Sequence, residues 1–183
     1  MNMQHRFMRT FLTAHALAAA LANGPVAAQT IKPQADLTVF KTAAGEITML
    51  HSIVPMNNAH DVELLGFVKR GGTGPATHIP FEIGSDYEPY LNMRTGADCM
   101  VSSARVLRDG NRLRVLYARR KGEWLDKKPV TLELFELTAN DEDAPGTPAL
   151  YFRSRKKADT KTVYCDVNDA LDKEAASFTR GIK

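Results

Sequence analysis

Short runs of β-branched and aromatic residues, separated by turn-forming residues, make up most of this 183-residue chain. The runs 37–40 and 47–54 flank an Ala-Ala-Gly-Glu turn, and the runs 100–108 and 111–120 flank Asp109-Gly110. An Asp-Gly pair accepts the positive φ that a tight hairpin turn requires. Strand-like runs bounded by turn residues predict antiparallel pairing. The same pattern predicts further strands over residues 61–69, 130–138, 149–155 and 162–164.

The periodicity changes from strand to helix after Cys165. Apolar residues recur on one helical face from Val167 to Phe178, and Asp166 precedes them in the N-cap position. We therefore predict a helix at about residues 166–179. The fold class expected from the whole pattern is α+β, mainly antiparallel β (a sandwich or a partly closed barrel) with one C-terminal helix.

The first 28 residues have the order of a secretory signal. Arg6 and Arg9 precede a short apolar run, and Val26-x-Ala28 supplies the small side chains of a cleavage site. The run is about a dozen residues, whereas a transmembrane helix needs about 20. We expect a cleaved signal peptide at 1–28 and a single small β-rich domain at 29–183, with no transmembrane segment after cleavage. The expected location is the bacterial periplasm or the medium as a secreted protein.

The charge of the chain gives no global argument for a nucleic-acid partner. The formal net charge is +3, and loss of Arg6 and Arg9 leaves 22 basic against 21 acidic residues, a net charge of +1. Nucleic-acid-binding domains carry a basic surface with a high overall charge. We expect no nucleic-acid partner, and any electrostatic function must come from local clusters.

Cys99 and Cys165 are the only two cysteines. An even number of cysteines in an exported protein favours a disulfide. The alternative is a redox-active or metal-binding thiol pair. The cysteines lack the C-x-x-C spacing of redox motifs, and a zinc site needs more ligands than two thiols. We expect a structural disulfide, no metal and no cofactor.

Residues 105–128 are rich in Arg and Lys. With a two-residue Asp109-Gly110 loop, Arg105 would lie opposite Arg114, with Arg112 on the same face and the apolar residues on the other. Opposed like charges destabilise a sheet. A docking surface for an acidic partner or an anionic envelope component would explain them. The alternative is a solvated sheet face whose arginines pair with Glu133. The predicted partner-binding residues are Arg105, Arg112, Arg114, Arg119, Arg120 and Trp124; Trp124 could instead be partly buried core.

A second candidate site lies in the Gly- and Pro-rich stretch from Arg70 to about Ala97. The density of Gly and Pro excludes a long helix, and the apolar content predicts a packed loop with a short strand at 79–83. Its candidate residues are His78, Asp86, Tyr87 and Tyr90. His78, Asp86 and Glu88 could converge on a metal, although their spacing matches no known ligand pattern. The tyrosines could form a binding rim.

Catalytic motifs are absent from the sequence. It contains neither a G-x-S-x-G elbow nor H-E-x-x-H. We therefore predict no catalytic residues. We predict that the chain is an exported protein of the bacterial envelope with a binding or accessory function. It would dock an acidic protein partner through the basic hairpin and the Gly/Pro-rich loop. The alternatives are a small periplasmic hydrolase or ligand-binding enzyme that uses the 70–97 loop, and a purely structural envelope component.

Overall fold

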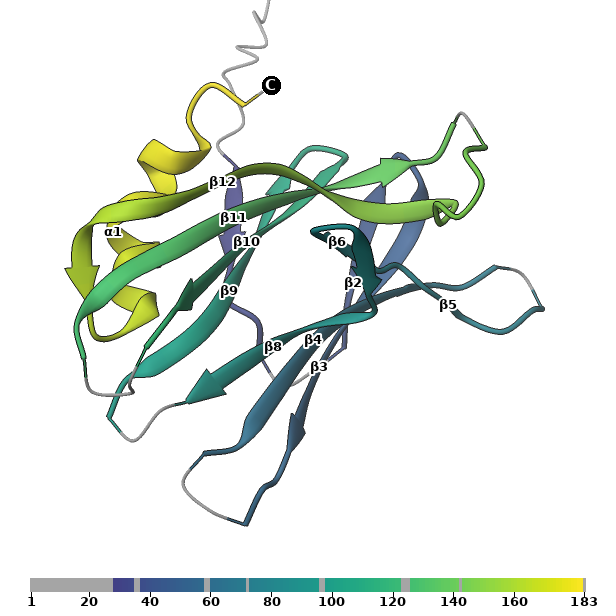
Figure 1. Cartoon of the computed structure of the whole chain (residues 1–183). Helices are drawn as coiled ribbons and strands as arrows, with labels where there is room; N and C mark the ends of the chain where they lie inside the picture. Colours follow the sequence, from purple (N-terminus) through teal and green to yellow (C-terminus); the bar gives the residue numbers. More distant parts are fainter. Residues whose placement is uncertain are drawn as a thin grey trace, which may run out of the picture.

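A computed structural model describes residues 28–34, 37–57, 60–71, 73–95, 98–122, 126–141 and 143–182. These residues form a twelve-stranded sheet and one helix (Figure 1). The strands are β1 (Gln29–Ile31), β2 (Leu37–Thr42), β3 (Gly45–Val54), β4 (Val62–Lys69), β5 (Thr77–His78), β6 (Phe81–Ile83), β7 (Asp86–Glu88), β8 (Tyr90–Thr95), β9 (Met100–Asp109), β10 (Arg112–Arg120), β11 (Lys128–Ala139) and β12 (Leu150–Tyr164). The helix is α1 (Val167–Thr179). Apart from Ala28, the predicted signal peptide lies outside the described residues.

The sheet is open, and its strands follow the order β2-β3-β4-β8-β9-β10-β11-β12-β6-β7. β1 adds to β9 and β5 adds to β4. The described strand pairs are antiparallel except β12 with β6. The predicted α+β fold, mainly antiparallel with one C-terminal helix, is confirmed.

Both faces of the β9–β11 region are buried. Alternate residues of each strand point to opposite faces. One face packs into a core built around four buried phenylalanines, Phe67, Phe81, Phe135 and Phe152. The other face carries Leu107, Leu116, Leu132 and Leu134 and packs against α1. Because each face meets an apolar layer, these strands are buried along most of their length.

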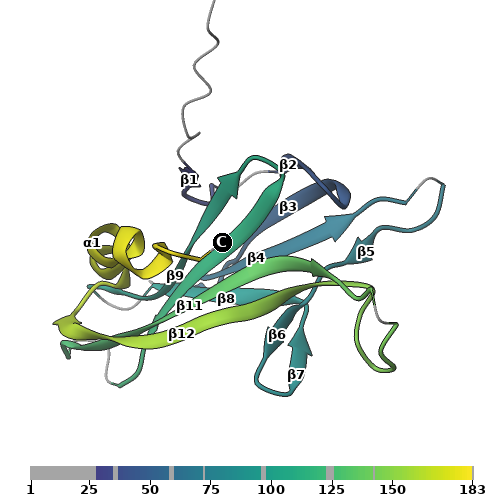
Figure 2. The same cartoon turned by 90° about the horizontal axis from the view of Figure 1, so that it is seen from above.

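The helix covers the face opposite the phenylalanine core. It contacts β9, β10, β11 and β12 (Figure 2). Its buried residues, Val167, Ala170, Leu171 and Phe178, are those of the predicted apolar face. The predicted disulfide is also present: Cys99 and Cys165 are bonded, with Cα atoms 5.8 Å apart. The start of the helix is therefore held to the start of β9.

Asp166 caps the helix and ties it to the sheet. One carboxylate oxygen accepts the Asn168 N–H at 2.7 Å, and the other accepts the Met100 N–H at 3.3 Å. We expect Asp166→Ala to lower the free energy of unfolding by about 1–2 kcal/mol, because both donors lose their partner. Asp166→Asn keeps a capping oxygen and should cost much less. Urea unfolding of the two variants measures the difference, and equal losses would contradict the capping role.

The stretch from 70 to 97 is more regular than we predicted. It contains four strands, and β8 lies inside the sheet between β4 and β9. Leu91 and Met93 alternate into the core, and Tyr90 faces Gly66 across the ladder. Of the predicted strand at 79–83, residues 81–83 form β6. The expectation of an otherwise irregular loop is wrong, because strands this short lie between Gly and Pro residues that hide their alternation.

β12 also differs from the prediction. Two strands, 149–155 and 162–164, were expected with a break between them. The structure has one strand of 15 residues whose pairing with β11 shifts register twice. The shifts change which face each residue takes, so the strand shows no continuous period of two. At the start of the predicted mature chain, where the sequence predicts a mobile lead-in at 29–34, residues 29–31 instead form β1 against β9.

Candidate functional site

The basic hairpin turns one residue later than predicted. Asp109 pairs with Arg112, so the two-residue loop is Gly110-Asn111, and the positive φ of 57° lies at Gly110. Arg105 consequently faces Leu116, and Arg114 faces Leu107. The predicted Arg105–Arg114 opposition is wrong. The observed register separates the two like charges, and because it is shifted by an even number of residues, each side chain keeps its predicted face.

Arg105 lies under the helix. Its side chain is only 5% exposed, and its guanidinium donates to Asn168 at 3.0 Å and Asp172 at 3.1 Å. Asn168 and Asp172 are four residues apart, so both lie on one side of the helix and reach Arg105 together. Arg105 therefore fastens α1 to β9. Charge reversal at Arg105 would therefore test how the helix packs on the sheet and would not test the docking of a partner.

Arg114 is buried in the same layer and also has an internal acid. Its Nε lies 3.5 Å from Glu136, which in turn lies 3.2 Å from Arg155. The acid expected from the sequence, Glu133, instead binds Lys157 at 3.1 Å. A groove of about 680 Å³ runs between α1 and the hairpin and is lined by Arg105 and Arg114. Both cations are committed to internal partners, so this groove offers little charge to a ligand.

The other predicted docking residues lie at the two ends of β10. Arg112 is exposed at the hairpin turn, whereas Arg119 and the buried Arg120 lie at the far end of the strand. Trp124 lies outside the described residues. The predicted set is therefore divided between the helix-covered face and the two ends of β10, and residues of the 70–97 segment lie near both ends.

Two adjoining recesses open at the hairpin end of the sheet; together we call them the rim cleft. Their volumes are about 350 and 410 Å³, and they share Ala44, Ala139 and Leu150. The first recess also includes the hairpin residues 111–113. The second includes residues 77–79, which belong to the Gly- and Pro-rich stretch at 70–97. The rim cleft thus brings together the two segments that the sequence singled out separately.

Hydrogen bonds between turns fix the shape of the rim cleft. The Ala43 N–H donates to the Asn111 carbonyl at 3.4 Å, which joins the β2–β3 turn to the hairpin turn. Asn140 closes the β11–β12 loop: its side-chain amide donates to the carbonyls of Ala144 and Thr147, at 3.3 and 3.2 Å. The walls of the cleft are therefore set before a ligand arrives.

The rim cleft combines apolar walls with cations. Leu113, Leu150 and Ile79 provide apolar surface. Arg112 and Lys69 line the two recesses, and neither forms an ion pair with another described residue. The one acid in the lining, Glu136, is already paired with two arginines. Such a surface suits an acidic segment that also carries apolar side chains.

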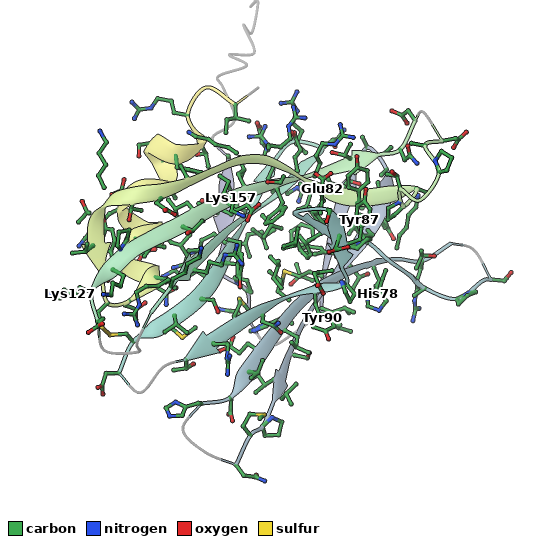
Figure 3. All side chains as sticks on the ribbon, viewed as in Figure 1. His78, Glu82, Tyr87, Tyr90, Lys127 and Lys157 are labelled. Atoms are coloured by element: carbon green, nitrogen blue, oxygen red, sulfur yellow. A yellow bond between two sulfur atoms is a disulfide. The ribbon has the colours of Figure 1, made fainter. Side chains whose placement is uncertain are left out.

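Of the four residues of the second candidate site, His78 and Tyr90 lie two positions apart along the same edge of β4, opposite Val68 and Gly66, and Asp86 and Tyr87 lie on β7. His78 is exposed on β5, which pairs with β4, and Asp86 is exposed on β7 beyond β6. Tyr87 packs edge-on against Tyr151, with ring centroids 5.6 Å apart, and Tyr90 is exposed on β8 (Figure 3). Within the described ranges, no group of three or more His, Cys, Asp and Glu residues could hold a metal. Of this set, only His78 lines the rim cleft.

A hydrogen-bonded His–Glu pair that was not predicted from the sequence lies between β3 and β4. His51 Nε2 is 2.7 Å from Glu63 Oε2, and the His51 side chain is 5% exposed. Counting alternate residues places both on the inner face, so strand register could have found the pair. His51 Nδ1 has no hydrogen-bond partner among the described residues. In the described part of the chain, no hydroxyl or thiol therefore bonds to this histidine as a nucleophilic triad requires.

Comparison with known proteins supports the fold and no more. No protein-family model matches the chain, and no curated protein matches it. A solved structure titled "Crystal structure of CarG" is similar, with a TM-score of 0.70 and 15% sequence identity. The similarity covers 82% of this chain and 98% of that one. At this identity the match shows a shared fold and says nothing of function. In the described part of the chain, no helix is long and apolar enough to cross a membrane.

Proposed function

We propose that this protein is an exported bacterial envelope protein that binds an acidic segment of a partner protein at the rim cleft. The observation that carries the proposal is the meeting of the hairpin turn with residues 77–79 around two cations that lack a described acidic partner. The sequence order of the first 28 residues supports export. The disulfide also supports it, since such bonds persist in oxidising compartments.

The geometry favours binding over hydrolysis. The alternative enzyme needed His78, Asp86 and Glu88 to converge; His78 lies on β5 and the two acids on β7, and no three His, Cys, Asp or Glu side chains of the described residues group as a metal site. A binding function requires only a preformed apolar surface with a few placed charges, which the rim cleft has.

Charge reversal at the rim cleft tests the proposal. We expect the Arg112→Glu/Lys69→Glu double variant to recover at least about fivefold less of the partner from envelope extracts, because acidic groups would then meet like charges. Lys127→Glu is the matched control, since Lys127 is an exposed cation at the opposite end of the molecule (Figure 3). Quantitative mass spectrometry of captured proteins at low and high salt measures the loss. Equal recovery by wild type and double variant, or an equal loss with Lys127→Glu, would refute this assignment of the surface.

A further inference from the structure

A separate recess at the far end of β10 gathers arginines from two strands; we call it the arginine pocket. Its volume is about 280 Å³. The described residues that line it are Asn92, Arg94, Val101, Ser102, Tyr117, Arg119, Arg120 and Gly122. None of these residues is acidic. The pocket therefore concentrates positive charge without a lining carboxylate from the described part of the chain.

Arg119 is the lining residue that offers a hydrogen-bond donor to a ligand most clearly. Its strand neighbours are Ser102 and Thr131, which carry no charge. Its Nε atom is buried and has no hydrogen-bond partner among the described residues. A buried donor without an acceptor destabilises a fold until an acceptor reaches it. The exposed Arg94 side chain forms no ion pair with a described residue either.

Two hydroxyl groups give the pocket a fixed and neutral wall. Tyr117 and Ser102 both donate to the Asn92 carbonyl, at 2.7 and 3.0 Å, and Ser102 Oγ accepts the Arg94 N–H at 2.9 Å. Burial raises the pKa of the Tyr117 hydroxyl above its ordinary value. Tyr117 therefore stays uncharged at neutral pH, and no phenolate offsets the arginines.

We propose that the arginine pocket binds a small soluble oxyanion, held by Arg94 and Arg119. Guanidinium groups present paired donors that match the oxygens of phosphate, sulfate and carboxylate groups. Ligand pockets for drug-sized molecules span roughly 300–1,000 Å³, so a recess just below this range fits a ligand of few atoms.

The arginine pocket is independent of the rim cleft. Arg112 and Arg119 are seven residues apart on one strand, which is roughly 23 Å at about 3.3 Å per residue. An odd separation also places the two side chains on opposite faces of the sheet. Loss of binding at one site therefore leaves the other intact, and the two proposals can fail separately.

Titration of the ¹⁵N-labelled full protein with sodium phosphate, sodium sulfate or sodium succinate, at fixed ionic strength, tests the proposal. We expect saturable shifts at the amides of residues 92–94, 101–103 and 117–122. Arg119→Gln and Arg94→Gln should each weaken binding at least about tenfold. Lys41→Gln, which changes an exposed cation on β2, should bind as wild type does. Tighter binding of phosphate or sulfate identifies an inorganic-type anion, and tighter binding of succinate identifies a carboxylate; either result supports the pocket.

Shifts that rise linearly without saturation, or that spread over all cationic surfaces and persist in Arg119→Gln, would overturn the proposal. Melting temperatures in anion-free buffer show whether each variant is folded. Arg94 is exposed, so Arg94→Gln keeps the test decisive if Arg119→Gln fails to fold.

Discussion

Removal of the Cys99–Cys165 disulfide is expected to lower the free energy of unfolding by about 4 kcal/mol. The bonded cysteines are 66 residues apart, and a cross-link over that length removes substantial chain entropy from the unfolded state. For a domain of this size the loss corresponds to roughly 10 °C in melting temperature. The Cys99→Ser/Cys165→Ser variant and dithiothreitol-treated wild type should both show it in thermal unfolding followed by circular dichroism.

The effect of the disulfide should be largest where the bond holds the helix. Hydrogen exchange of α1 should rise more than that of the distant β2–β3 pair, because Cys165 directly precedes the helix N-cap, Asp166, and Cys99 directly precedes β9. The control is the double variant treated with dithiothreitol. Its melting temperature should not change, because the bond that dithiothreitol reduces is already absent. A melting temperature that falls by less than about 2 °C on removal of the bond would contradict this account.

Phe152→Ala is expected to cost about 3–5 kcal/mol of stability. Phe152 is fully buried, and its ring centroid lies 4.7 Å from that of Phe67 and 4.8 Å from that of Phe81. Phe67 lies on β4, whereas Phe152 and Phe81 lie on the paired strands β12 and β6, so the three rings join β4 to strands that are far from it in the sheet order. Truncation would remove these contacts and leave a cavity.

Val163→Ala on the same strand is the control for this prediction. Its side chain is 48% exposed, so its loss should change stability by no more than about 0.5 kcal/mol. Phe152→Leu, which retains most of the volume, should fall between the two. Urea unfolding gives all three values. A cost below about 1 kcal/mol for Phe152→Ala would show that the three rings do not hold the sheet together.

Local signals predicted the parts of the fold that depend on neighbours in sequence. The Asp109-Gly110 pair located the hairpin to within one residue, and the helix was predicted from its apolar period and from Asp166. The alternation of residues also placed Arg105, Arg112 and Arg114 on one face correctly, but the expectation that the apolar residues all take the other face is wrong, because Leu107 and Leu116 share the arginine face. The alternation of residues could not show that α1 would cover the arginine face. That depends on where a helix some 60 residues later in the chain packs.

The rim cleft could not be predicted for the same reason. Arg112 and His78 were each candidates, yet nothing in the sequence placed them in adjoining recesses. Their meeting depends on β5 pairing with β4 and on the bond between Ala43 and Asn111. Lys69 was expected only as the last residue of a strand. Long-range pairing of short strands determines this end of the molecule, and short strands carry weak local signals.

Site-specific photocrosslinking in cells tests the central claim most directly. A photoreactive amino acid at position 112 would sit in the rim cleft, and one at position 127 would sit at the opposite end of the sheet (Figure 3). Our account predicts that position 112 gives a discrete crosslinked envelope protein, that Lys69→Glu reduces this product, and that position 127 gives none. Crosslinking of the same protein from both positions, or from position 127 alone, would contradict docking at the rim cleft.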